Sequence, residues 1–236
     1  MTNLKKAMQV EQQLRNENNY NVRTLAPLVK EFGYNTAKEY LEERNAYLFQ
    51  NWKPEVIRPE IKEIGILCQN AVKNEECKII IPEENGIRVW EGDEKVDHDL
   101  CKELGIQIEN VGAGGGTIIG SEKDFSMMLI MPNEIRLTLE DILNKFVEII
   151  SKHIPNVIWI GNDILVDDKK VCGTTYRILD NVAVFTCQVS FEDYTEYIEK
   201  ICTKKSTKVP SHIDPSILSK DKFEEEVLNW LVNKAQ

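Results

Sequence analysis

The sequence predicts an α+β fold in which a mixed, largely antiparallel sheet is flanked by helices. Three observations support this prediction. Short β-rich segments, separated by turn residues, fill the middle of the 236-residue chain. Amphipathic helical patterns stand at residues 138–153 and 219–234, and residues 1–50 carry a helical pattern without strands. Strands and helices that occur in separate groups are typical of α+β architecture.

The N-terminal region predicts a helical extension. Its apolar pattern is interrupted at Gly33, Tyr34 and Asn35, which gives the outline of a helix-turn-helix. The second helix carries three glutamates that DNA phosphates would repel, so packing or oligomerisation is favoured over DNA binding. Residues 52–60, WKPEVIRPE, are interpreted as a linker because of their two prolines. We therefore divide the chain into an extension, residues 1–55, and a folded domain, residues 56–236.

The next elements are short. Residues 61–74 suggest a helix or a helix–strand boundary, and strands are predicted in the segments KIIIP (78–82) and GIRVWEGD (86–93). A helix over 97–105 ends at Gly105. The strand IQIEN (106–110) leads into a glycine-rich stretch. The apolar run FSMMLIMP (125–132), which a proline ends, predicts a central strand.

The clearest element is a helix over Thr138–His153. Its apolar residues follow the 3.6-residue period, and Thr138 with Asp141 resembles a capping box. Strands at 157–160 and 164–166 frame a turn, and the Asp167–Asp168 pair predicts a hairpin into 169–177. A long strand over 181–191 and an amphipathic helix over 219–234 complete the domain.

Composition restricts the function classes. The net charge of −10 argues against nucleic acid as a partner. No apolar run approaches the ~20 residues that cross a bilayer, and the N-terminus lacks the apolar region of a signal peptide. The six cysteines form no C-x-x-C pair and are expected to be reduced. We therefore expect a cytoplasmic protein without membrane contact.

The segment VGAGGGTIIG (111–120) holds five of the 12 glycines. It lies between two predicted strands, so it is neither a Walker loop nor a Rossmann fingerprint, which both precede a helix. A glycine-rich turn between strands can offer backbone N–H groups to an anion or a flat wall to an acyl chain. The alternative is a tight bend at the edge of a sheet.

The segment NDILVDDKKVCG (162–173) predicts a polar cluster beside a strand. Strict alternation places Lys170 on the same face as Cys172 and Thr174, opposite Lys169. An inward-facing lysine needs an anionic partner, either Asp163 or an oxygen of a ligand phosphate or carboxyl group. The alternative is an exposed hairpin lysine.

Together, two segments resemble the biotin–protein ligase and lipoate–protein ligase superfamily. Residues 102–119, KELGIQIENVGAGGGTII, resemble the lipoate-ligase pattern of a helix, a strand and a Ser-Gly-Gly-Gly loop. Residues 159–177, WIGNDILVDDKKVCGTTYR, resemble the Asn-Asp and Lys-Val/Ile-x-Gly signature of both ligase types. The resemblance covers about residues 60–236, is closer to the lipoate branch, and implies a class II synthetase-like core.

The resemblance implies an ATP-dependent reaction. A carboxylic acid such as lipoate becomes an acyl-adenylate, and its acyl group passes to a lysine of a lipoyl- or biotinyl-type carrier domain. Lys170 matches the lysine that contacts the acyl carbonyl and the phosphate. Asn162 and Asp163 match residues near the adenylate, and Asp163 is the expected Mg²⁺ ligand. The other residues implied to bind the adenylate are Gly114, Gly115, Gly116, Thr117 and Gly173.

The chain also departs from the family pattern. Asn110, Val111 and Gly161 stand where lipoate ligases have arginines. Each lost charged hydrogen bond is worth about 1.5–3 kcal/mol, so weak ATP binding is expected. The alternatives are a non-catalytic member that binds an acid or a partner, a biotin–protein ligase, or an ATP-independent acyltransferase with Cys172 as nucleophile.

Overall fold

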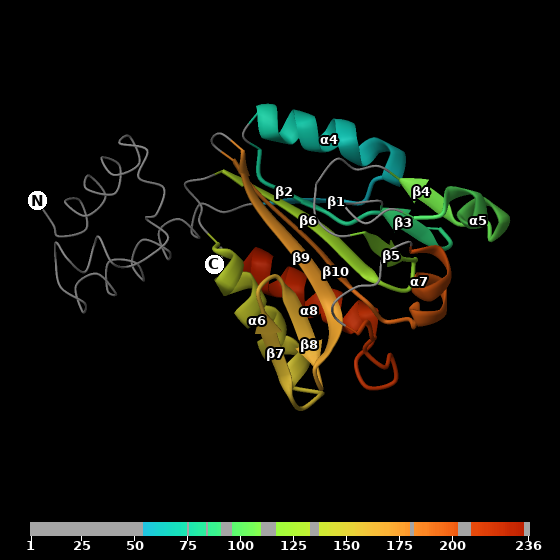
Figure 1. The fold of residues 1–236 in the computed structure, drawn as a ribbon. Coiled ribbons are helices and arrows are strands. Elements are labelled where there is room, and N and C mark those ends of the chain that lie inside the picture. The colour runs from blue at the N-terminus through green and yellow to red at the C-terminus, as the bar shows by residue number, and fades with distance from the viewer. Residues whose placement is uncertain are drawn as a thin grey trace, which may run out of the picture.

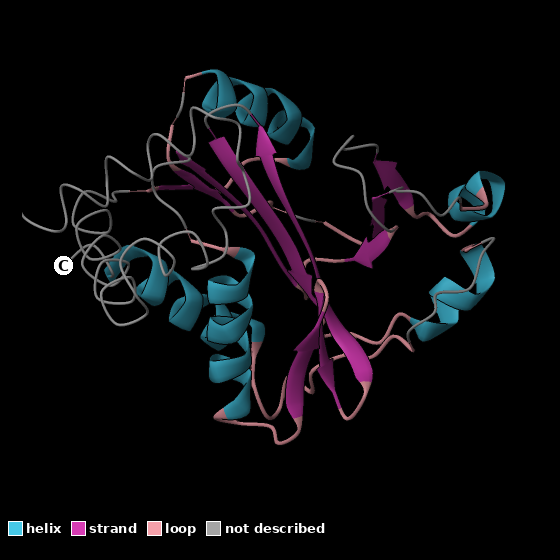
Figure 2. Cartoon of the chain, turned by 60° about the vertical axis from the view of Figure 1, so that its left-hand side comes forward, coloured by secondary structure: helices cyan, strands magenta, loops and turns pink. Residues whose placement is uncertain are grey.

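The structure, a computed structural model, describes residues 54–74, 76–83, 85–90, 96–109, 117–132, 137–179, 182–202 and 209–233. The helical extension expected at residues 1–50, with its helix-turn-helix outline, lies outside this part. The described residues form two sheets with helices on both sides of the larger one (Figures 1 and 2). This arrangement confirms the α+β prediction.

The larger sheet has seven strands in the order β1-β2-β6-β10-β9-β8-β7. The strands are β1 (Glu55–Ile57), β2 (Lys78–Ile80), β6 (Phe125–Pro132), β7 (Val157–Ile160), β8 (Asp163–Val166), β9 (Lys169–Leu179) and β10 (Val182–Val189). All neighbours are antiparallel except β1 and β2. The apolar run at 125–132 is β6, which has a neighbour on each side, so its interior position is confirmed.

The hairpin between β8 and β9 is also confirmed. Asp167 and Asp168 have φ angles of 48° and 63°. Positive φ at both central residues is the mark of a two-residue turn that matches the twist of its strands.

Helices α6 (Leu139–Ser151) and α8 (Lys220–Asn233) cover one face of this sheet (Figure 1). The capping box of α6 is present, because the Thr138 hydroxyl accepts from the Asp141 N–H and the Asp141 carboxylate accepts from the Thr138 N–H. Phe223 of α8 lies with its ring centroid 5.2 Å from that of Phe146 and 5.3 Å from that of Phe125. The main core is therefore the layer between these two helices and the sheet.

The other face is covered by α4 (Ile61–Lys73) at one end. Ile61, Ile64 and Ala71 pack there against apolar residues of β2, β6 and β10. The smaller sheet, in the order β4-β3-β5, consists of β3 (Arg88–Trp90), β4 (Gln107–Glu109) and β5 (Ile118–Gly120). It shares a separate core with α5 (His98–Glu103) and α7 (Thr195–Ile201).

One sequence interpretation is wrong. Residues 55–57, assigned to a linker, form β1 and pair in parallel with β2 from Glu55 opposite Lys78 to Ile57 opposite Ile80. A three-residue strand between prolines has no readable alternation, and its partner lies 23 residues later in the sequence.

Within the described residues, no helix is long and apolar enough to span a membrane.

Candidate functional site

One row of residues crosses four strands of the large sheet. Asp163 on β8 lies opposite Gly173 on β9, Gly173 lies opposite Gln188 on β10, and Gln188 lies opposite Ser126 on β6. Directly opposed residues share a face of a sheet. The chain neighbours of Gln188 on both sides belong to the core beneath α6 and α8. The row therefore faces away from that core, on the side of the sheet where α4 packs.

A β-bulge brings Lys170 onto the same face. On β8, the consecutive residues Ile164 and Leu165 pair with Cys172 and Lys170, so Val171 is an extra residue on β9. An extra residue in one strand inverts the alternation of side chains beyond it.

The Lys170 side chain consequently lies over Gly173. A Cβ atom at Gly173 would be 3.1 Å from Lys170 Nζ and 3.2 Å from its Cε. Cys172 is 1% exposed and belongs to the main core on the other face. The prediction that Lys170 shares a face with Cys172 and Thr174 is therefore wrong, because strict alternation makes no allowance for the bulge.

The backbone of Lys170 is held by a segment distant in sequence. Its N–H donates to the Val209 carbonyl at 2.9 Å, and the Ser211 N–H donates to the Lys170 carbonyl at 2.8 Å. The ladder between β9 and β10 ends at Cys172, and residues 209–211 satisfy the backbone groups of Lys170 beyond that end. The lysine side chain thus projects from a fixed backbone.

Lys170 pairs with Asp163. The distance from Lys170 Nζ to Asp163 Oδ1 is 2.9 Å, and the two side chains are 38% and 17% exposed. The expected anionic partner of the lysine is thereby confirmed. An ion pair this exposed contributes little to folding. The pair matters for ligand binding, because it holds one cation and one carboxylate side by side where a charged ligand can reach them.

Asn162 completes this end of the site. It lies in the turn between β7 and β8, and its carbonyl accepts hydrogen bonds from the Thr174 N–H at 2.9 Å and the Thr174 hydroxyl at 2.8 Å. These bonds fix the turn on β9. The structure therefore brings Asn162, Asp163, Lys170 and Gly173 together, as the second sequence motif predicts.

We expect Gly173→Ala to displace the Lys170 side chain, because the new methyl group would be closer to Nζ than nearly all ordinary Cβ contacts. For the acyl-adenylate formation that the family resemblance implies, the rate should fall by about tenfold or more. The melting temperature should change little, because the displaced side chain is partly exposed. Parallel measurements of rate and melting temperature test this. A lower rate accompanied by a clearly lower melting temperature would contradict this expectation, because it would indicate that the substitution unfolds the protein.

Gln188 links the two sequence motifs. Its Nε2 donates to the Ile119 carbonyl at 2.6 Å and lies 3.4 Å from Asp124 Oδ2. A Cβ atom at Gly120 would lie 2.2 Å from the same Nε2, so only glycine permits this approach. Strand β5, which forms the end of the glycine-rich stretch, is therefore attached to β10, the strand that runs beside Gly173.

Most of the glycine-rich stretch lies outside the described residues, which resume at Thr117. Gly114, Gly115, Gly116, Asn110 and Val111 lie outside the described residues, so their roles remain predictions. Thr117 is half-buried directly before β5. Gln188 was not singled out in the sequence, although it is the one glutamine in the apolar segment NVAVFTCQVSF.

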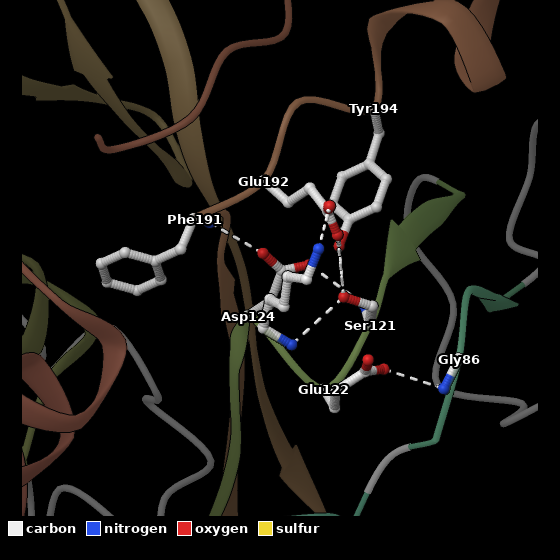
Figure 3. Close-up of polar contacts among 8 residues, drawn as sticks. Gly86, Ser121, Glu122, Asp124, Phe191, Glu192 and Tyr194 are labelled. Carbon is white, nitrogen blue, oxygen red and sulfur yellow. Dashed lines mark hydrogen bonds and ion pairs between the residues drawn. The ribbon is translucent and has the colours of Figure 1, made fainter. Parts of the chain in front are cut away.

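A polar clamp, consisting of Ser121, Asp124, Glu192 and Tyr194, fixes the turn between β5 and β6 (Figure 3). The Tyr194 hydroxyl donates to Ser121 Oγ at 2.7 Å. Asp124 accepts from the backbone N–H groups of Ser121 at 3.1 Å and Phe191 at 2.7 Å. Burial raises the pKa of Asp124, against the effect of these hydrogen bonds, and burial also raises the pKa of Tyr194. The clamp holds β5 and the segment after β10 together.

Two other arginines are candidates to replace the positive charges of the family arginines, which this sequence lacks at positions 110, 111 and 161. Arg177 is exposed on β9 and shares the face of Gly173, about 13 Å further along the strand. Arg88, on β3, is 9% exposed, and its Nη2 donates to the Asn85 carbonyl at 3.4 Å. Arg177 is therefore the arginine that extends the charged side of the site.

The structure argues against Cys172 as a nucleophile. Burial raises the pKa of its thiol, and the side chain lies on the core face. Among the described residues, no group of three His, Cys, Asp or Glu side chains could hold a metal ion. Asp163 is the carboxylate that pairs with Lys170.

A comparison with protein-family models identifies one family. The model of the family described as "Lipoyl protein ligase A/B catalytic domain" matches residues 88–220, which is more than half of the chain. This range includes the whole row from Ser126 to Gln188. A search of curated sequences finds no match.

Solved structures show the same fold. P. falciparum LipL1, in complex with lipoate, has a TM-score of 0.62 at 13% identity, and the match covers 75% of this chain but only 59% of that one. A bipartite lipoate protein ligase from Thermoplasma acidophilum, studied with its E2 lipoyl domain, has a TM-score of 0.59 at 11% identity, with 78% and 84% covered. A lipoate-protein ligase A bound with ATP has a TM-score of 0.57 at 13% identity, with 78% and 85% covered.

Proposed function

The chain belongs to the family of lipoyl protein ligase A/B catalytic domains, and we propose that it activates a carboxylic acid with ATP and transfers the acyl group to a carrier lysine. The proposed catalytic unit comprises residues 56–236. The observation that carries the proposal is the Lys170–Asp163 pair, held over Gly173 by the bulge. The acid is lipoate or a related acid, and the partner is a carrier domain of lipoyl or biotinyl type.

In the first half-reaction, a carboxylate oxygen of the acid attacks the α-phosphorus of ATP, and pyrophosphate leaves. Negative charge develops on the α-phosphate oxygens and must be stabilised more strongly in the transition state than in the bound substrates. The Lys170 ammonium, on its fixed backbone, lies over Gly173 of the row and supplies this stabilisation. Arg177, further along the same face, is placed to meet the outer phosphates.

The charges fit a magnesium nucleotide. Mg²⁺ is usually held by one or two carboxylates together with substrate phosphates. Asp163 offers one carboxylate, with one of its oxygens directed to Lys170. When bound, Mg²⁺ would neutralise phosphate charge in the departing pyrophosphate. Asp163 would also keep Lys170 oriented before the nucleotide arrives.

In the second half-reaction, the neutral amine of the carrier lysine attacks the acyl carbonyl, and AMP leaves. The carbonyl oxygen becomes an oxyanion, which the same Lys170 ammonium can stabilise, since the family resemblance implies that this lysine contacts both the acyl carbonyl and the phosphate. One lysine therefore serves both half-reactions. The partial exposure of Lys170 leaves room for the incoming carrier chain.

Pyrophosphate exchange tests the first half-reaction. Incubation of the protein with ATP, Mg²⁺, labelled pyrophosphate and either lipoate, octanoate or biotin should return label to ATP with at least one acid. The similar structures of a ligase in complex with lipoate and of a ligase bound with ATP support this choice of reagents. If no acid gives exchange where a known ligase does, the adenylation proposal is wrong.

A second candidate is a non-catalytic member of the fold. It is favoured by Gly161, a turn residue with φ of 65°, at the position where the family resemblance implies an arginine. Calorimetry separates the candidates. A non-catalytic member would bind the acid or the carrier with an affinity that ATP does not change, whereas the proposed ligase would bind the acid more tightly when nucleotide is present.

A further inference from the structure

Two buried polar atoms in the row have no hydrogen-bond partner among the described residues. Ser126 Oγ and Gln188 Oε1 are both buried, and neither makes a hydrogen bond within the part of the chain that the structure describes. Their residues are 8% and 5% exposed and lie directly opposite each other on β6 and β10. A buried polar atom without a partner is destabilising, so such atoms call for a ligand or water.

The orientation of Gln188 is fixed by its other atom. Its Nε2 donates to the Ile119 carbonyl, and a flipped amide would place two oxygens against each other there. The oxygen of the amide is therefore the atom left without a partner. Because a carbonyl oxygen can only accept, the missing group must carry an O–H or N–H.

The row changes character from one end to the other. Asp163 and Lys170 at the β8 end are charged and partly exposed, and Arg177 extends this charged side along β9. Ser126 and Gln188 at the β6 end are uncharged and buried. Strands lie about 4.8 Å apart, so Gln188 is one strand and Ser126 two strands away from Gly173. The charged end suits phosphates, and the buried end suits the chain of the acid whose carboxylate meets Lys170.

We propose that Gln188 and Ser126 select an acid whose chain carries a hydrogen-bond donor, such as a hydroxyl or amide N–H. Gln188 Oε1 accepts a hydrogen bond from this donor. The Ser126 hydroxyl forms a second hydrogen bond with the same hydroxyl or amide group of the acid. A plain hydrocarbon chain would leave both atoms unpaired. The inference rests on the proposed function for the place of the carboxylate, and it narrows the substrate class of that site.

Equilibrium binding of free acids, measured by calorimetry on the full chain without ATP, tests this selection. The probes are octanoate and a series of hydroxyoctanoates that differ in the position of the hydroxyl. At least one hydroxyoctanoate should bind about tenfold more tightly than octanoate, the effect of a single hydrogen bond. Equal affinity for all members, or no binding of any acid, would overturn the proposal.

A matched pair of serines separates a binding role from a structural one. Ser126→Ala should erase the preference for the hydroxyl, and the melting temperature of the ligand-free protein should stay equal or rise by about 2 °C because an unpaired polar atom is removed. Ser121→Ala, five residues earlier, removes a hydroxyl that is bonded in the polar clamp. This control should lower the melting temperature and keep the preference.

The outcomes distinguish this inference from the proposed function. A hydroxyl preference that survives in Ser126→Ala, or a Ser126→Ala protein that melts as low as Ser121→Ala, would overturn the role of Ser126. Pyrophosphate exchange with octanoate and hydroxyoctanoates at equal affinity would overturn the selection and leave adenylation intact. A Ser126-dependent preference without exchange would support the selection and refute adenylation.

Discussion

Lys170→Ala is expected to lower the rate of acyl-adenylate formation by about 10²–10³-fold, the usual cost of removing one group that stabilises transition-state charge. The ammonium group of Lys170 lies over Gly173 of the row, and its carboxylate partner Asp163 cannot replace a positive charge. The substitution should leave the fold intact, because the hydrogen bonds to Val209 and Ser211 involve backbone atoms. Single-turnover kinetics with ATP and the acid measure the rate directly.

Lys169 provides the matched control. It has the same side chain, is adjacent in sequence and is exposed in the strand before the bulge. Lys169→Ala should react at nearly the wild-type rate with nearly the wild-type melting temperature. Equal rates for the two alanine variants would show that Lys170 has no specific role in the reaction. Any loss of rate would then come from the loss of one positive charge at either position.

Phe223→Ala is expected to cost about 3–5 kcal/mol of unfolding free energy, the range for a large aromatic side chain removed from a core. Phe223 is fully buried, and its ring meets those of Phe125 and Phe146 edge-to-face at centroid distances of 5.3 Å and 5.2 Å. A third ring, Phe191, lies 6.1 Å away. Truncation would leave a cavity between α8 and β6, and urea denaturation would report the loss.

Val232 on the same helix serves as the control for Phe223. It is 41% exposed, so Val232→Ala should change the unfolding free energy by less than about 0.5 kcal/mol. A cost below about 1 kcal/mol for Phe223→Ala would contradict the account. It would show that α8 does not close the main core.

Local signals in the sequence predicted much of the fold. The α6 helix follows from a 3.6-residue period and the Thr138–Asp141 capping box, and both operate within a few residues. The hairpin at Asp167–Asp168 follows from residues that tolerate positive φ. Each of these features is encoded where it occurs, so no knowledge of distant contacts is needed.

Features that depend on distant contacts were missed. The bulge at Val171 is stabilised in part by residues 209–211, and β1 exists because β2 offers it an edge. Gln188 is a binding candidate only because its strand lies between Gly173 and Ser126. The family resemblance was enough to assign Lys170 and Asp163 to one site. The face of the sheet on which Lys170 lies could be determined only from the structure, because it depends on the bulge.

The most direct test of the central claim is mass spectrometry of the full chain after incubation with ATP, Mg²⁺ and an acid that it binds. The account predicts a non-covalent complex with the mass of the acyl-adenylate, present in the wild-type and Lys169→Ala proteins and greatly reduced in Lys170→Ala. A wild-type protein that carries only the unmodified acid, under conditions where a known ligase forms its adenylate, would contradict the account.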